Sequence, residues 1–153
     1  MQGRTLTARE IHEARTVFRD RIDYQRPRIF ATRHPLAVRR NQVLAPDGNI
    51  YWPGAADNLA KEDDMPMLST FIHEMAHVMQ YQHGVNVLAN GFGLHAARIL
   101  SFRRYDPYEY RFDAGKPYKS YNIEQQAEIA VGIHLQWYPN IIDYAEIPPT
   151  RLR

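Results

Sequence analysis

Residues 67–82, MLSTFIHEMAHVMQYQ, carry the strongest helical pattern in the chain. Apolar residues recur there at spacings of three and four, as one face of an α-helix requires: Leu68, Phe71, Ile72, Met75 and Met79. His73, Glu74 and His77 fall outside this apolar arc. The pattern predicts a helix that packs one side against the core and offers a polar face on the other, with Gly84 as its C-cap.

Weaker patterns on both sides of this helix predict further helices and a few short strands. Helices are expected over residues 8–19, 92–103 and 122–137, and strands over residues 28–32, 43–45 and 50–52. Capping boxes at Thr7 with Glu10, and at Asn122 with Gln125, mark two helix starts. We therefore expect one α+β domain over residues 1–153, mainly helical, with a small antiparallel hairpin or sheet before the 67–82 helix.

Length and composition limit the class of protein. A chain of 153 residues with 44% hydrophobic and 24% charged residues is typical of a globular domain rather than a disordered segment. The chain has no cysteine, which excludes disulfides, cysteine zinc ligands and a thiol nucleophile. No apolar run resembles a signal peptide or a membrane span, so we expect a protein of the producing cell's cytoplasm or one exported without a cleaved signal.

The charge is unevenly distributed. Residues 1–40 hold ten arginines against Glu10, Glu13, Asp20 and Asp23, which gives +6 in a chain of net charge +2. This segment could be a docking face for nucleic acid or an acidic partner. It could equally be a solvated surface whose arginines pair with acidic residues elsewhere. No nucleic-acid motif or interleaved aromatic residue accompanies the charge, so we expect no nucleic-acid partner.

The motif His73-Glu74-Met75-Ala76-His77 carries the chemistry. Two histidines four residues apart on a helix stack on one side, where both Nε2 atoms can reach a single zinc ion. Zinc lowers the pKa of a bound water molecule toward ~7, and Glu74 can accept the proton as a general base. Gln80, near the same face, could hydrogen-bond a metal ligand or be an ordinary surface residue.

A catalytic zinc site needs a third protein ligand, and the spacing leaves several candidates. Glu124 and Glu128 of the final helix lie one turn apart and could both face the metal. His83, His95 and His134 are histidine alternatives, although each is more typical of a packed or surface residue. A second oxyanion donor is expected among the tyrosines of residues 105–121, Tyr138 and His134, and the sequence does not choose between them.

Two segments, FIHEMAHVMQ from Phe71 to Gln80 and YNIEQQA from Tyr121 to Ala127, resemble a family of small bacterial zincin metallopeptidases. Members of this family occur beside or fused to type VI secretion spike (VgrG) and Rhs-type proteins. Residues 6–11 and the segment from Val43 to Trp52 are also similar to the family, so the resemblance covers nearly the whole chain.

The resemblance implies a gluzincin-like site in which His73, His77 and Glu124 bind zinc and Glu74 is the general base. Glu128 would then accept a hydrogen bond from a histidine Nδ1–H as a residue behind the ligands. The implied activity is hydrolysis of peptide bonds, and the implied substrate is a protein or peptide.

The resemblance also implies partners and a destination. They are VgrG or Rhs secretion components, or an immunity protein, with export from the cytoplasm by type VI secretion.

Two other functional classes compete with a peptidase. One is a catalytically silent zincin-fold adaptor of the secretion machinery that makes its contacts through the arginine-rich N-terminal segment. The other is a DNA-associated regulatory zincin, which needs a helix-turn-helix segment that 153 residues leave no room for.

Overall fold

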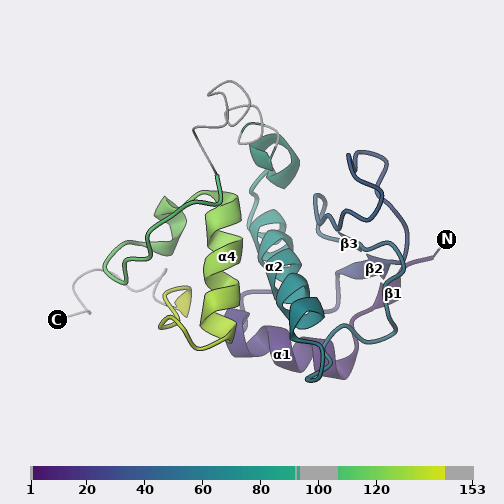
Figure 1. Ribbon diagram of the computed structural model, residues 1–153, viewed down its shortest axis with the longest axis horizontal. Coiled ribbons are helices and arrows are strands. Elements are labelled where there is room, and N and C mark those ends of the chain that lie inside the picture. The colour runs from purple at the N-terminus through teal and green to yellow at the C-terminus, as the bar shows by residue number, and fades with distance from the viewer. Residues whose placement is uncertain (1, 92, 94–106, 144–153) are drawn as a thin grey trace.

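The computed structural model describes residues 2–143 except 92 and 94–106 (Figure 1). The helices and strands in chain order are β1 (Arg4–Thr5), α1 (Ala8–Phe18), β2 (Arg28–Phe30), β3 (Ile50–Tyr51), α2 (Met65–Gln82), a 3₁₀ turn (Tyr118–Ser120) and α4 (Ile123–His134). Residues 87–91 are also helical, and the helix expected over 92–103 lies outside the described residues apart from residue 93. The α+β class is confirmed.

Helix α1 forms where the capping box predicts it. The Thr7 side chain accepts the backbone N–H of Glu10, and the Glu10 side chain accepts the backbone N–H of Thr7. The helix ends at Phe18, since Arg19 adopts a left-handed φ of 51° that cannot continue it. Glu10 also does more than cap, because it accepts the backbone N–H of Leu59 at 2.8 Å and pairs with Arg4.

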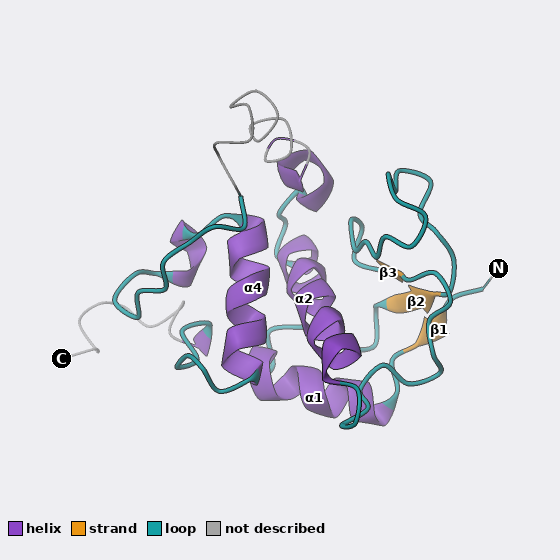
Figure 2. Cartoon of the chain, in the orientation of Figure 1, coloured by secondary structure: helices purple, strands orange, loops and turns teal. Residues whose placement is uncertain are grey.

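The three strands form a mixed sheet in the order β1-β2-β3 (Figure 2). Strand β1 pairs antiparallel with β2, and β2 pairs parallel with β3 through Ile29 and Ile50. The expected antiparallel hairpin survives only as an isolated bridge between Leu44 and Tyr51. The expectation of a purely antiparallel sheet was therefore wrong, because β3 takes its main partner from β2 rather than from the segment just before it.

Helix α2 begins two residues earlier than the apolar pattern predicts. Asp64 caps it by accepting the backbone N–H of Met67, and Pro66 lies in the first turn, where a missing N–H removes no helical hydrogen bond. The helix ends at Gln82, and Gly84 follows with a left-handed φ of 87°. His83 is the C-cap residue, and Gly84, the glycine expected to cap the helix, follows it.

Helix α4 starts at its capping box of Asn122 and Gln125, as expected. It ends at His134 rather than near Trp137, because Gln136 has a left-handed φ of 62° and turns the chain back. The backbone N–H of Trp137 then bonds the carbonyl of Gly132 at 2.8 Å.

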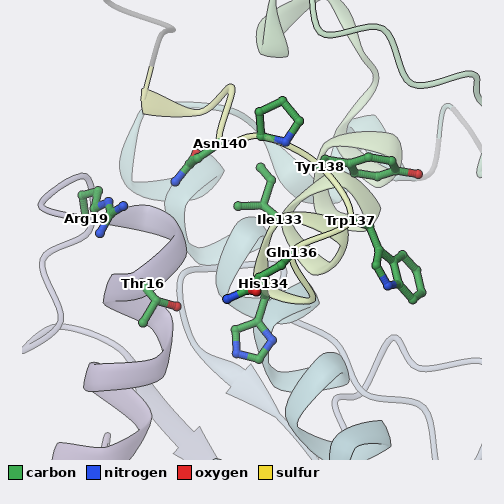
Figure 3. Close-up of a pocket in the computed structure, with 9 residues that line it drawn as sticks. Thr16, Arg19, Ile133, His134, Gln136, Trp137, Tyr138 and Asn140 are labelled. Carbon is green, nitrogen blue, oxygen red and sulfur yellow. The ribbon is translucent and has the colours of Figure 1, made fainter.

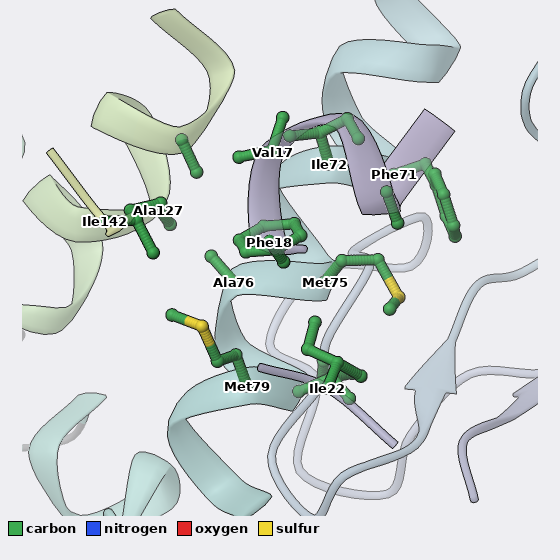
Figure 4. Packing of buried hydrophobic residues seen from close by; sticks show 14 of the residues in the cluster. Val17, Phe18, Ile22, Phe71, Ile72, Met75, Ala76, Met79, Ala127 and Ile142 are labelled. Atoms are coloured by element: carbon green, nitrogen blue, oxygen red, sulfur yellow. The ribbon is translucent and has the colours of Figure 1, made fainter. Parts of the chain in front are cut away.

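The hydrophobic core lies between α1, α2 and α4, as Figure 4 shows from close by. Phe18 of α1, Phe71 and Met75 of α2, and Ala127 of α4 are all fully buried in it. Among the described elements α2 packs most extensively against α4. Ala76 and Val78 of α2 are also fully buried, so this helix is covered on nearly all sides. No helix among the described residues is long and apolar enough to cross a bilayer.

Candidate metal centre

Helices α2 and α4 lie side by side and antiparallel (Figure 2). Three cross-helix contacts set this direction: Gln80 reaches Ile123, His77 reaches Glu124 and His73 reaches Glu128. The polar face of α2 was expected on the side away from the core, and α4 covers it there. His77, Glu74 and Gln80 are only 5%, 6% and 3% exposed.

His73, His77 and Glu124 come together as a cluster whose nearest ligand atoms all lie within 4.8 Å of one another. One carboxylate oxygen, Glu124 Oε2, lies 3.3 Å from His73 Nε2 and 3.4 Å from His77 Nε2. The two imidazole rings stand at 76° to each other with centroids 5.0 Å apart. Both Nε2 atoms therefore face the same carboxylate oxygen, which is the arrangement that a shared metal ion requires.

These distances fit a tetrahedral metal site. Bonds of about 2.0–2.1 Å at the tetrahedral angle place neighbouring ligand atoms about 3.3–3.4 Å apart. The two distances from Glu124 Oε2 to the histidine nitrogens, 3.3 and 3.4 Å, match this spacing. They are longer than an ordinary N–H···O hydrogen bond, for which about 2.9–3.0 Å is usual. The two edges that include Glu124 therefore have the length that a tetrahedral site needs, and the third, between the two histidines, lies within 4.8 Å.

Each histidine has its other ring nitrogen engaged. His73 Nδ1 lies 2.9 Å from Glu128 Oε1, and His77 Nδ1 lies 2.8 Å from Gln80 Oε1. A carboxylate only accepts hydrogen bonds, so His73 Nδ1 carries a proton; in the neutral imidazole that binds a metal ion, Nε2 is then the nitrogen with the lone pair.

The orientation of the Gln80 amide fixes the state of His77 in the same way. Gln80 Nε2 donates to the Ile123 carbonyl at 3.0 Å and to Gln126 Oε1 at 3.1 Å. Gln126 Nε2 in turn donates to the Tyr121 carbonyl at 2.8 Å. Since carbonyl oxygens only accept, Gln80 must present its own oxygen to His77 Nδ1–H. In a neutral His77, Nε2 is then the nitrogen available to bind a metal ion.

Glu74 differs from the other polar residues of the face. It is 6% exposed, and its side chain accepts no hydrogen bond from any described residue. Burial raises the pKa of its carboxyl above the ordinary value, while His73 and His77 act in the opposite direction. A poorly solvated carboxylate with a raised pKa has the basicity that a proton acceptor needs.

The cluster itself is strongly polarised. Burial alone would raise the pKa of Glu124, but its contacts with His73 and His77 hold that pKa well below the usual range. Burial alone would lower the pKa of His73, but the contacts with Glu124 and Glu128 raise it to about 10. The pKa of His77 is raised against burial by the same Glu124 carboxylate. In this structure Glu124 is a carboxylate facing two imidazoles that compete for it.

The other histidine candidates lie elsewhere. His83 Nε2 bonds the carbonyl of Arg21 at 2.7 Å, and His134 Nε2 lies 3.1 Å from Glu13 Oε2 of α1. Neither can reach the cluster. His95 lies outside the described residues.

In the tyrosine region, the hydroxyls of Tyr110, Tyr118 and Tyr121 contact groups outside the cluster: the Tyr138 hydroxyl, the Gln126 carbonyl and the Asp113 carbonyl. Burial raises the pKa of Tyr110, and the charge of Glu128 raises it further. The Tyr110 hydroxyl lies 3.5 Å from that of Tyr138. Tyr138 itself stacks on Phe112. The choice of a second oxyanion donor stays open.

A hollow lies at the opposite end of α4 from Glu124, where the end of α1 meets the segment from Ile133 to Asn140 (Figure 3). It includes none of the cluster residues.

The sequence analysis did not single out Gln126, which accepts a hydrogen bond from Gln80 across the interface between α2 and α4. Its only signal was its place one turn before Ala130 on the face of α4 toward α2.

The fold and the cluster together define a class: an α+β domain that could hold a metal ion between two histidines of one helix and a glutamate of an antiparallel neighbour. No protein-family model matches the chain. The chain is 40% identical over 129 residues to the type VI secretion system spike protein VgrG2b of Pseudomonas aeruginosa, a match that covers 83% of this chain and 12% of VgrG2b.

A solved structure, the effector domain of P. aeruginosa VgrG2b, matches with a TM-score of 0.78 at 37% sequence identity. The match covers 94% of this chain and 80% of that domain. The chain therefore belongs to the family of the VgrG2b effector domain. It corresponds to about an eighth of the length of the whole spike protein.

Proposed function

We propose that this chain is a zinc-dependent peptidase that acts as a type VI secretion effector. The observation that carries the proposal is the match between the 3.3 and 3.4 Å spacings around Glu124 Oε2 and the edges of a tetrahedral zinc site. His73, His77 and Glu124 would hold the ion. Two imidazoles and one carboxylate form a donor set typical of catalytic zinc, and they leave a fourth position open.

The chain's own residues would divide the work of peptide hydrolysis. A zinc ion at the site supplies a Lewis acid that polarises the peptide carbonyl and acidifies a water molecule. The Glu74 carboxylate takes the proton of the attacking water and returns it to the leaving amine. Glu128 and Gln80 hold the Nδ1–H groups of His73 and His77, which keeps both Nε2 lone pairs directed at one point.

The substrate of the proposed hydrolysis is a peptide bond of a protein or peptide. The secretion role rests on the relative's description as a spike protein with an effector domain. We extend it to this chain as delivery by a type VI system from the producing cell's cytoplasm, in association with VgrG or Rhs components, with an immunity protein as the natural antagonist.

Two variants of the purified chain test the proposal. Glu74→Gln should retain one zinc per chain and lose peptide hydrolysis by roughly 10²–10⁴-fold, because it removes the base and leaves the ligands intact. His77→Ala should lose the zinc itself. Metal content by elemental analysis and cleavage of an unfolded protein substrate are the two readouts.

Wild-type turnover in the Glu74→Gln variant would overturn the role of that base. A full equivalent of zinc in His77→Ala would overturn the metal site. A zinc-loaded wild type that cleaves no peptide in a broad library would instead favour the adaptor.

A further inference from the structure

The ten arginines of residues 1–40 divide into two groups by their contacts. Those before residue 22 have partners: Arg4 pairs with Glu10, Arg9 with Glu13 and Glu62, Arg15 with Asp20, Arg19 with Asp143, and Arg21 donates to a backbone carbonyl. Those from residue 26 onward form no ion pair with any described residue: Arg26, Arg28, Arg33, Arg39 and Arg40. No acidic residue lies between Asp23 and Asp47. The first group is therefore paired within the fold. In the second group Arg33 donates a hydrogen bond to the Ala37 carbonyl, and Arg39 and Arg40 have no ion-pair partner among the described residues.

Three of these arginines belong to residues 33–40, here called the basic loop, which connects β2 to β3. Hydrogen bonds hold the loop in one shape. The backbone N–H of Ala37 donates to the His34 carbonyl at 3.0 Å, and that of Val38 donates to Gln42 Oε1 at 2.8 Å. Ala37 is only 4% exposed, so the middle of the loop is anchored on the protein.

The anchoring turns apolar side chains outward. Leu36 and Val38, on either side of the buried Ala37, are 48% and 80% exposed. Arg39 and Arg40 follow directly and are also exposed. In Figure 1 the chain between β2 and β3 lies on the sheet side of α2, away from α4 and the metal centre. The loop thus presents two aliphatic side chains beside the exposed guanidinium groups of Arg39 and Arg40.

We propose that the basic loop is a membrane-surface contact that binds anionic phospholipid headgroups while Leu36 and Val38 enter the interface. Exposed aliphatic side chains next to arginines are the combination that partitions into a headgroup layer. Guanidinium groups suit bidentate contact with phosphate oxygens. The inference is independent of the metal and of the proposed peptidase activity.

Two other partner classes fit the loop less well. A stable protein interface buries about 800 Å² on each side and is rich in Trp and Tyr, which eight residues without an exposed aromatic do not supply. Single-stranded nucleic acid is held by aromatic stacking platforms, and the ring of His34 is already packed edge-on against Tyr51 at 4.6 Å. A lipid surface needs no aromatic stacking and can be bound through a few cationic and apolar side chains.

The test is co-sedimentation of the full chain with vesicles of equal parts phosphatidylglycerol and phosphatidylcholine, compared with vesicles of phosphatidylcholine alone. We expect binding only to the anionic vesicles, weakening as salt rises. Since each arginine near an anionic surface strengthens binding by roughly fivefold, Arg39→Gln/Arg40→Gln should weaken it by roughly 25-fold. Leu36→Ser/Val38→Ser should weaken it by roughly tenfold or more without changing the charge.

The matched control is Arg9→Gln/Arg19→Gln, which removes the same charge from ion-paired positions outside the loop and should stay within about threefold of wild type. Equal weakening by this control would show that net charge alone drives binding and would overturn the proposal. Unchanged binding by Leu36→Ser/Val38→Ser would remove the insertion step and overturn it as well. So would a wild type that leaves anionic vesicles unbound, which would return the loop to a protein or nucleic-acid partner.

Discussion

Gln80 is the residue whose replacement tests the metal centre most sharply. It is 3% exposed and makes three hydrogen bonds: from His77 Nδ1, to the Ile123 carbonyl and to Gln126 Oε1. Gln80→Leu keeps the volume and removes all three. The loss of a partner behind a metal-binding histidine typically weakens metal affinity 10–100-fold. We expect that weakening for zinc here.

The same substitution should also lower the free energy of unfolding. Each buried hydrogen bond contributes about 1 kcal/mol net, and the unpaired His77 Nδ1–H adds a penalty of about 1–3 kcal/mol. The sum is a loss of roughly 4–6 kcal/mol in the metal-free protein. Stability is measured by urea unfolding with a chelator present, and zinc affinity by competition with a chromophoric chelator.

Gln126→Leu is the matched control, because it separates metal positioning from helix packing. It removes the Gln80–Gln126 bond and the bond to the Tyr121 carbonyl, but leaves the His77–Gln80 contact in place. It should destabilise the chain by about 2 kcal/mol and change zinc affinity by less than about threefold. Gln80→Leu with wild-type zinc affinity would refute the positioning role. Equal weakening of zinc binding by Gln126→Leu would refute it too, since packing alone would then account for the effect.

Two further predictions follow from the contacts of three carboxylates. Glu124→Ala should be purified largely without zinc, whereas Glu128→Ala, which removes only the partner of His73 Nδ1, should bind zinc 10–100-fold more weakly, as elemental analysis and titration would show. Glu10→Gln should lower the free energy of unfolding by about 3 kcal/mol in urea and leave zinc affinity unchanged, because it breaks a buried pair with Arg4 far from the metal centre.

Features set by neighbouring residues could be predicted from the sequence. Both capping boxes lie within four residues of chain, and both form as expected. The pairing of His73 with His77 depends only on helical spacing. The second role of Glu10 could not be predicted, since its partner Leu59 lies 49 residues away and contributes only a backbone N–H. Nearly every residue type has a backbone N–H, so the sequence does not indicate which one will donate.

The polar face of α2 shows a second limit. Its position on the helix and the approach of the final helix were predicted, but its burial was not, because α4 also brings Gln126 and a backbone carbonyl to cover it. Gln80 could have been a surface residue on the pattern alone, yet it is buried and fully engaged with Gln126 and the start of α4. Periodicity separates polar from apolar faces, but a polar face can be buried when another helix supplies its hydrogen bonds.

The choice between Glu124 and Glu128 shows why the third ligand needed tertiary structure. The two carboxylates lie one turn apart on α4, a rise of about 5.4–6 Å, and both face His73. The two nitrogens of an imidazole point in different directions. The His73 ring lies between the two carboxylates, so each of its nitrogens faces one of them. Glu124 takes Nε2, which His77 Nε2 also faces, and Glu128 takes Nδ1, which His77 does not approach. Because only Glu124 contacts both histidines through one oxygen, it is the carboxylate that could share a metal ion with them, and Glu128 is placed to orient His73.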